Sequence, residues 1–238
     1  MKVLVEPGGL DRRIQFVVEH TDVVRNPKQR LATFGTTRLT YFLVTEPVYE
    51  DILKGEQETV LRRGKVSAER PRIVTPFYLR NRFQGFEHSR EYLEYLLRKF
   101  GAQQSALLYE YKNELEETSI ISNNMQEVVA HLNETLDRES NPLSAIIKGV
   151  DEMWDVSLMK FIHEFTGTSL KDNVMELAAR GLLDMDSSGV PREARQRIEE
   201  LFQFVQKGEL SPSDLKLELD RWGLFGEYED RFLGLFRR

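Results

Sequence analysis

The first third of the chain alternates hydrophobic and polar positions in the way that β-strands do. In "RIQFVVE", residues 13–19, Ile14, Phe16 and Val18 fall on one face of an expected strand. The run "LTYFLV" at 39–44 is apolar on both faces, which is the pattern of a central strand. Further strands are predicted in four stretches: "VLRRGKVSAE" with a hairpin turn at Gly64, "RIVTP", "SALLYEY" and "TSIIS".

One helix is predicted among these strands, because apolar residues recur at helical spacing just before Gly101. Its apolar stripe consists of Tyr92, Leu93, Leu96, Leu97 and Phe100.

From Asn124 onward the hydrophobic period is 3.6 almost throughout. Asn124 and Glu127 form a capping box for a helix whose inward positions are Met125, Val128, Val129, Leu132 and Leu136. Residues 142–165 predict a central buried helix that contains Trp154. Further helices are expected to begin near Ser169, Pro191 and Ser211 and to end the chain in "YEDRFLGLF", with Gly181 closing the first of them.

This change of period near residue 123 predicts an α+β protein. A β-rich N-terminal part is followed by an all-helical C-terminal part, and we expect them as domains 1–123 and 124–238.

Composition narrows the class of protein. Hydrophobic residues make up 40% and charged residues 30% of the 238 positions, which is ordinary for a globular protein. The chain has no cysteine, its first apolar run "VLV" is too short for a signal peptide, and no run approaches the roughly 18 residues of a membrane span. We therefore expect a cytoplasmic protein without a membrane partner.

The charge is distributed unevenly along the chain. Residues 1–100 hold 18 basic and 13 acidic residues, whereas the remainder holds 15 and 26. Segments of opposite sign attract each other or recruit different partners, although exposed helices also favour glutamate for their own stability.

No motif predicts a cofactor or a catalytic centre. The four histidines fall in four different predicted elements, and no pair has metal-ligand spacing. The sequence contains neither of the common glycine-rich phosphate loops and no G-x-S-x-G nucleophile elbow. A Ser–His–Asp triad assembled from distant positions stays open.

The segment "DMDSSGVPREAR" has part of a calcium-loop pattern. Asp184, Asp186, Ser188 and Gly189 match positions 1, 3, 5 and 6 of an EF-hand loop. Position 12, which should supply a bidentate glutamate, is Arg195, and position 8 is Pro191. A guanidinium at that position repels the ion, so we expect no calcium and no other metal.

A helix-turn-helix is a second candidate motif, with its turn at Gly167. In that arrangement the buried positions of the second helix would fall on Asn173 and Glu176, which are polar. The same helix has no surplus of positive charge to neutralise phosphates, so we do not expect it to bind DNA well.

Two basic segments in the N-terminal half are candidates for anion binding. Residues 25–38 carry four basic residues and no acidic one, and residues 62–90 carry eight basic residues and two glutamates. Arginine interleaved with aromatic residues is typical of surfaces that hold phosphates and stack bases, although such arginines also extend around a core. The candidate phosphate contacts are Arg25, Lys28, Arg30, Arg80 and Arg82, and the candidate stacking residues are Tyr78 and Phe83.

Three functional hypotheses follow from these patterns. The leading one is a non-enzymatic interaction or regulatory protein whose acidic helical half docks a protein partner. The second is a nucleic-acid-binding module that uses the basic N-terminal surface. The third is an enzyme with a site between the two halves.

Overall fold

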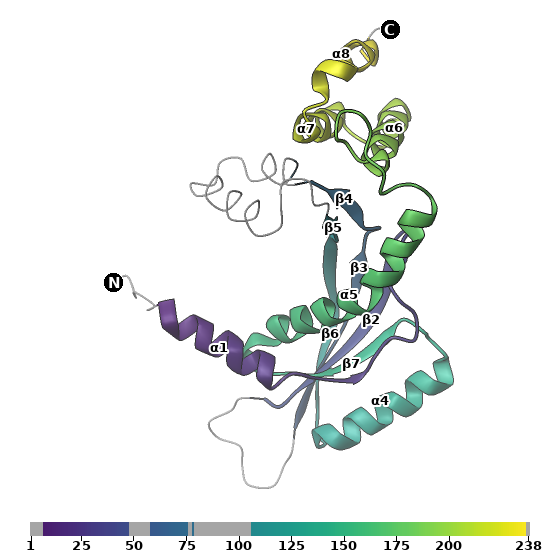
Figure 1. Cartoon of the computed structure of the whole chain (residues 1–238). Coiled ribbons are helices and arrows are strands. Elements are labelled where there is room, and N and C mark those ends of the chain that lie inside the picture. Colours follow the sequence, from purple (N-terminus) through teal and green to yellow (C-terminus); the bar gives the residue numbers. More distant parts are fainter. Residues whose placement is uncertain (1–6, 48–57, 76–77, 79–105, 237–238) are drawn as a thin grey trace. The chain divides into compact units, whose positions relative to one another are not determined.

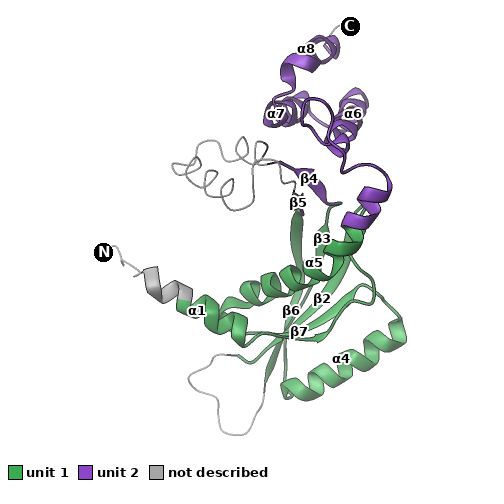
Figure 2. Ribbon diagram, in the orientation of Figure 1, with its two compact units in different colours: residues 1–70, 110–173 green, residues 71–109, 174–238 purple. Residues whose placement is uncertain are grey.

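The computed structural model describes residues 7–47, 58–75, 78 and 106–236 of the chain (Figure 1). These residues form two compact units. Unit 1 comprises residues 1–70 and 110–173, and unit 2 comprises residues 71–109 and 174–238 (Figure 2). The fold class is α+β, as the sequence predicts, with most strands in the N-terminal half and most helices in the C-terminal half.

A mixed five-stranded sheet is the centre of unit 1. Its strands, in spatial order, are β1 (Asp22–Arg25), β7 (Ser144–Lys148), β2 (Thr37–Thr45), β3 (Thr59–Ala68) and β6 (Tyr111–Ile121). β2 pairs parallel with β7 and antiparallel with β3. The predicted central strand at 39–44 is therefore confirmed, and its residues Tyr41, Leu43 and Val44 are fully buried.

Gly64 lies inside an unbroken strand, so the predicted hairpin turn at this residue is wrong. Its role is to leave room for a neighbouring ring. A Cβ at Gly64 would lie 2.5 Å from Oη of Tyr41 and 2.7 Å from the backbone oxygen of Glu114. The Tyr41 hydroxyl donates a hydrogen bond of 3.0 Å to Oδ1 of Asn113 in β6. Glycine at this position therefore lets a large buried tyrosine fit between strands.

Helix α4 (Met125–Glu139) covers one face of the sheet. The predicted capping box is confirmed in part, because Oδ1 of Asn124 accepts a hydrogen bond of 2.9 Å from the backbone N–H of Glu127. The predicted inward positions are confirmed too: they pack with residues of the sheet, namely Val44 and Ile146 and the half-buried Phe42, Leu61 and Ile121.

Helix α5 (Trp154–Ala179) lies on the opposite face (Figure 1). The hydroxyls of Thr166 in α5 and Tyr111 in β6 form a hydrogen bond there. Tyr111 is opposite Ala68, and strand alternation places both on the Tyr41 side of the sheet. The two faces are hereafter the α4 face and the α5 face.

Residues 13–19 form part of helix α1 (Pro7–Glu19), so the predicted first strand is wrong. Val17, which strand alternation would place opposite Ile14 and Phe16, is the residue that is buried, at 2% exposure. The C-terminal end of the helix is fixed to α5, because the hydroxyl of Thr21 bonds the Val17 carbonyl at 2.7 Å and Oγ of Ser157 at 2.8 Å. Three alternating positions alone do not distinguish a strand from a helix that uses only one of its faces.

Residues 144–148 form strand β7 instead of belonging to the predicted central helix. Ala145, Ile146 and Ile147 are fully buried between β1 and β2, and β-branched isoleucines suit this position. A short 3₁₀ turn, η1 (Asp151–Met153), then leads into α5. Trp154 is the first residue of that helix and is only half-buried, so its predicted burial at the helix centre is also wrong.

Helix α5 continues through Gly167, so neither the predicted new helix near Ser169 nor the helix-turn-helix exists. Its two polar residues at unexpected buried positions have partners. Nδ2 of Asn173 donates to the carbonyl of Leu31 at 2.9 Å, and Oγ of Ser169 accepts from the Leu31 N–H at 3.0 Å. Gly181, with φ +66°, follows the helix end as predicted.

In its described residues, unit 2 combines a strand pair and the end of α5 with three further helices. β4 (Arg72–Val74) pairs antiparallel with β5 (Ala106–Leu108), and the helices are α6 (Arg192–Gln206), α7 (Pro212–Trp222) and α8 (Phe225–Gly234). Helix starts near Pro191 and Ser211 are confirmed. The core contains Val74, Tyr78, Ile198, Phe202, Leu215, Leu219, Trp222 and Phe232. The helix predicted at 92–100 lies outside the described residues.

The two units do not coincide with segments 1–123 and 124–238. α4, β7 and the greater part of α5 belong to unit 1, because β7 supplies an inner strand of its sheet. β4 and β5 belong to unit 2. Among the helices described, none has both the length and the apolar character needed to cross a membrane.

Candidate functional site

The basic loop at 25–38 has two of its candidate arginines already paired. Nη2 of Arg25 lies 2.8 Å from Oδ1 of Asp137, and its Nη1 lies 3.3 Å from Oδ1 of Asn133. Arg30 forms an ion pair with Asp172 of α5. These carboxylates offset part of the charge that a phosphate would otherwise meet, and the role of Arg25 and Arg30 as phosphate contacts stays a prediction.

Lys28 keeps an exposed side chain, while its backbone N–H donates to the Pro142 carbonyl at 2.8 Å. The loop is therefore held by its backbone against the segment before β7. This is the arrangement of a strand-connecting loop, with the Lys28 side chain facing solvent.

Of the candidate residues in the second basic segment, Tyr78 is the one that the structure describes, because Arg80, Arg82 and Phe83 lie outside the described residues. Tyr78 is 1% exposed, and its ring centroid lies 4.6 Å from that of Trp222. A buried ring presents no face to a base, so Tyr78 is not a stacking residue in this structure.

A buried carboxylate holds Tyr78 in place. Its hydroxyl lies 3.1 Å from each carboxylate oxygen of Glu218, which is 5% exposed. Nε1 of Trp222 and Nη1 of Arg221 donate to the same carboxylate at 3.2 Å and 3.1 Å. Burial, and then the negative charge of Glu218, raise the pKa of the Tyr78 hydroxyl above its ordinary value. These hydrogen bonds compensate the buried negative charge of Glu218 within the core of unit 2.

The loop at 184–195 is closed by an arginine. Oδ1 of Asp186 accepts from the backbone N–H groups of Ser188 at 2.8 Å and Val190 at 2.9 Å, and its Oδ2 accepts from Nε of Arg195 at 2.8 Å. Gly189 has φ +76°, which favours glycine. No group of three or more His, Asp or Glu side chains that could hold a metal ion occurs among the described residues.

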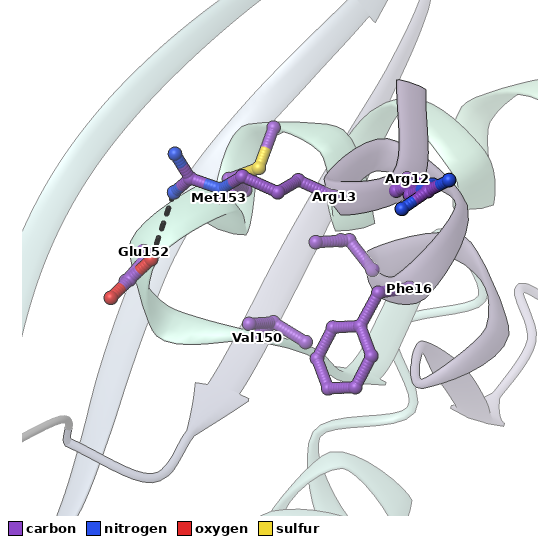
Figure 3. Close-up of a pocket in the computed structure, with 7 residues that line it drawn as sticks. Arg12, Arg13, Phe16, Val150, Glu152 and Met153 are labelled. Carbon is purple, nitrogen blue, oxygen red and sulfur yellow. Dashed lines mark hydrogen bonds and ion pairs between the residues drawn. The ribbon is translucent and has the colours of Figure 1, made fainter. Parts of the chain in front are cut away.

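A pocket of about 360 Å³ lies beside α1 in unit 1 (Figure 3). Its lining comes from one turn and a half of α1 and from the segment that leads into α5: Arg12, Arg13, Phe16, Val17, Val150, Glu152 and Met153. In the view of Figure 3, Arg13 reaches toward Glu152 at one end, and Phe16 lies beside Val150 at the other. The two nearest charged atoms, Nη2 of Arg13 and Oε2 of Glu152, are 2.9 Å apart.

The pocket is apolar inside and basic at its margin. Phe16 is 51% exposed, and its ring stacks on that of His20, just after the helix, with centroids 3.9 Å apart. Arg12 is exposed and forms no hydrogen bond or ion pair with the residues that the structure describes. The pocket therefore offers a hydrophobic side chain a place to bind and leaves one guanidinium at its edge for a carboxylate.

Sequence reasoning missed this pocket because it assigned α1 to a strand. The pair Arg12 and Arg13 followed by Phe16 and Val17 fits one helical face, and that spacing was the available signal. The contribution of Val150 and Met153 follows from tertiary packing, which the local pattern does not contain.

Comparison with known proteins gives no assignment: no family model, no curated protein sequence and no solved structure matches this chain.

Proposed function

We propose that the protein is a non-enzymatic interaction protein and that the α1 pocket binds an apolar side chain from an acidic segment of a protein partner. The observation that carries the proposal is the open apolar pocket with Arg12 at its margin, where this guanidinium has no partner among the described residues. An exposed apolar opening on a folded domain is unfavourable unless something covers it. A guanidinium beside it adds a charge-assisted contact for Asp or Glu in the same ligand.

The exposure of α1 supports the same proposal. From Arg12 to Glu19, Val17 is the one buried side chain, and Ile14, Phe16 and Val18 are 37%, 51% and 38% exposed. A short helix that leaves three large apolar side chains in water gains little from its own packing, whereas a bound partner would bury them.

This placement differs from the acidic helical half that the sequence favoured. On helices α7 and α8 of unit 2, or just beyond them, the exposed large apolar side chains are Leu217, Leu233 and Phe236. We therefore use Leu233 as the test of the original placement.

The experiment is peptide display on the immobilised full-length chain, followed by fluorescence anisotropy with the enriched peptides. We expect sequences in which a bulky apolar residue is flanked by Asp or Glu. Phe16→Asp and Arg12→Glu should each weaken binding by about tenfold or more, because they remove the apolar contact or reverse the charge at the pocket.

Met159→Asp is the matched control, since it adds the same charge at a similarly exposed apolar position of unit 1, on α5 and outside the pocket lining. Equal binding by wild type and Phe16→Asp would overturn the proposal. Loss confined to Leu233→Asp would return the docking surface to the acidic helices. Circular dichroism of each variant verifies that α1 still forms.

The nucleic-acid hypothesis is tested separately, by anisotropy with single-stranded RNA and duplex DNA over a salt series. Binding tighter than about 10⁻⁴ M at physiological salt, weakened by Lys28→Ala, would restore it as the function of the N-terminal segment.

A further inference from the structure

Strand β6 is an open edge of the unit 1 sheet. It is 11 residues long, and among the described residues it pairs with β3 alone. From Lys112 to Thr118 every side chain is exposed. The opposite edge differs, because β1 has only 4 residues and an irregular register between Val23 and Arg25. A long edge with unpaired backbone groups is a template for another strand.

The two faces of β6 have different chemistry. Leu115 lies opposite Gly64 and Ile120 lies opposite Val60, which places both on the α5 face. They are 43% and 55% exposed, so α5 does not cover them. The α5 side of this edge is therefore apolar and accessible.

The α4 side of the same edge is acidic. Glu114 and Glu117 lie opposite Lys65 and Arg63 of β3, but those two cations bind the intervening Glu116. The side chains of Glu114 and Glu117 have no hydrogen bond or ion pair with the described part of the chain. Two carboxylates are thus left facing the space beside the strand.

We propose that β6 binds an extended basic segment of a partner protein as an added strand. Main-chain hydrogen bonds to the open edge supply affinity in this mode of recognition, and alternate side chains supply specificity. A segment that alternates apolar residues with Lys or Arg would place its apolar side chains beside Leu115 and Ile120, and its cations beside Glu114 and Glu117.

The same charges argue against a second copy of this chain as the occupant. An antiparallel pair of β6 strands centred near Glu116 would bring the glutamates of one copy against those of the other. Like charges in cross-strand positions are destabilising. The acidic edge therefore disfavours pairing with β6 of a second copy and favours a strand of opposite charge.

The test uses the full-length protein and three synthetic probes of eight residues with blocked ends. The first alternates Val and Lys, the second alternates Val and Glu, and the third is the Val–Lys peptide with alternate backbone nitrogens methylated on the edge that would pair. Hydrogen–deuterium exchange of residues 112–120 is the readout. The Val–Lys peptide should slow exchange there by about tenfold or more, and the other two should not.

Charge reversal provides the second arm. Glu114→Lys with Glu117→Lys should weaken binding of the Val–Lys peptide by about tenfold and favour the Val–Glu peptide. Glu229→Lys with Asp230→Lys is the matched control, because it makes the same change in charge at two exposed residues of α8. The methylated peptide has the charge of the first probe, so it separates strand pairing from attraction to a negative protein.

Three outcomes would overturn the inference: protection, in the free protein, of those amides of 112–120 that do not bond β3, equal protection by the methylated peptide, or equal behaviour of the two double variants. The methylated probe needs no variant, so the test stands even where charge reversal disturbs folding. This surface shares no residue with the α1 pocket. Failure here leaves the proposed function in place, and failure at the pocket leaves this inference in place.

Discussion

Nε of Arg195 lies 2.8 Å from Oδ2 of Asp186, and this contact links the twelfth residue of the 184–195 loop to its third. The same guanidinium bonds Glu227 and lies 3.3 Å from the hydroxyl of Tyr228 in α8. In an EF-hand loop a calcium ion joins residues at positions three and twelve. Here the side chain of the twelfth residue is itself the cation.

The first prediction is that the loop binds no calcium at micromolar concentrations, because the Arg195 guanidinium already forms an ion pair with the carboxylate of Asp186. Isothermal titration calorimetry on chelator-treated protein is the measurement. A fitted calcium site that disappears in Asp184→Ala would contradict it.

Arg195→Ala should destabilise the protein by about 1–3 kcal/mol, since charged hydrogen bonds to a carboxylate are lost.

The second prediction concerns the acid side of the stability curve. Partial burial would raise the pKa of Asp186, but hydrogen bonds from Val190, Arg195 and Ser188 outweigh it, and the pKa lies below its ordinary value. A carboxyl with a lowered folded-state pKa stabilises the fold above its unfolded-state pKa, and this stability is lost as pH falls through the folded value. The stability difference between wild type and Asp186→Asn should therefore be constant above about pH 5 and shrink below about pH 4. Urea melts across this range test it, and a difference that grows on acidification would show the opposite sign.

Periodicity predicted the elements whose burial is local and regular. α4 shows this, because a capping residue, Asn124, precedes apolar positions that all face the sheet. Periodicity failed where the position of a segment in the tertiary structure decides whether it forms a helix or a strand. In the sequence, Ile146 and Ile147 fit the apolar pattern of a helix. In the structure they are strand residues of a sheet that is covered on both faces.

The candidate residues were predicted less well for a related reason. A sequence shows that Arg25 and Arg30 lack acidic neighbours along the chain, yet Asp137 and Asp172 come from α4 and α5. Arg195 is the converse case: the mismatch to a calcium loop was visible in the sequence, and the structure shows the partner that explains it.

The third prediction tests whether α5 is continuous through Gly167. A Cβ at Gly167 meets no atom within 4 Å, and glycine costs about 0.5–1 kcal/mol relative to alanine in a helix interior. Gly167→Ala should therefore raise stability by about that amount in thermal or urea melts. A helix-turn-helix turn at this residue would make the same change destabilising.

The fourth prediction uses Gly64 as the opposite case. Alanine there would place Cβ 2.5 Å from Oη of Tyr41, so the ring or the strand must shift. We expect Gly64→Ala to cost about 1–3 kcal/mol, the range for overpacking in a core. The double variant Gly64→Ala with Tyr41→Phe should recover part of this loss, because the hydroxyl is the nearest obstacle. No recovery would place the conflict at the backbone oxygen of Glu114 instead.

The last prediction uses the two tryptophans, because each unit has one. Trp222 of unit 2 is 6% exposed and donates to Glu218, whereas Trp154 of unit 1 is half-buried, with the guanidinium of Arg62 5.5 Å from its ring centroid. Trp154→Phe should therefore leave blue-shifted emission from Trp222, and Trp222→Phe should leave emission from Trp154 at longer wavelength. Trp222→Ala should cost about 3–5 kcal/mol, through its cavity and the lost donor to Glu218, and Trp154→Ala clearly less. Steady-state fluorescence and urea melts of the variants provide both measurements. Emission maxima in the reverse order would contradict the burial of both residues, and equal losses of stability would contradict the position of Trp154 at the start of α5.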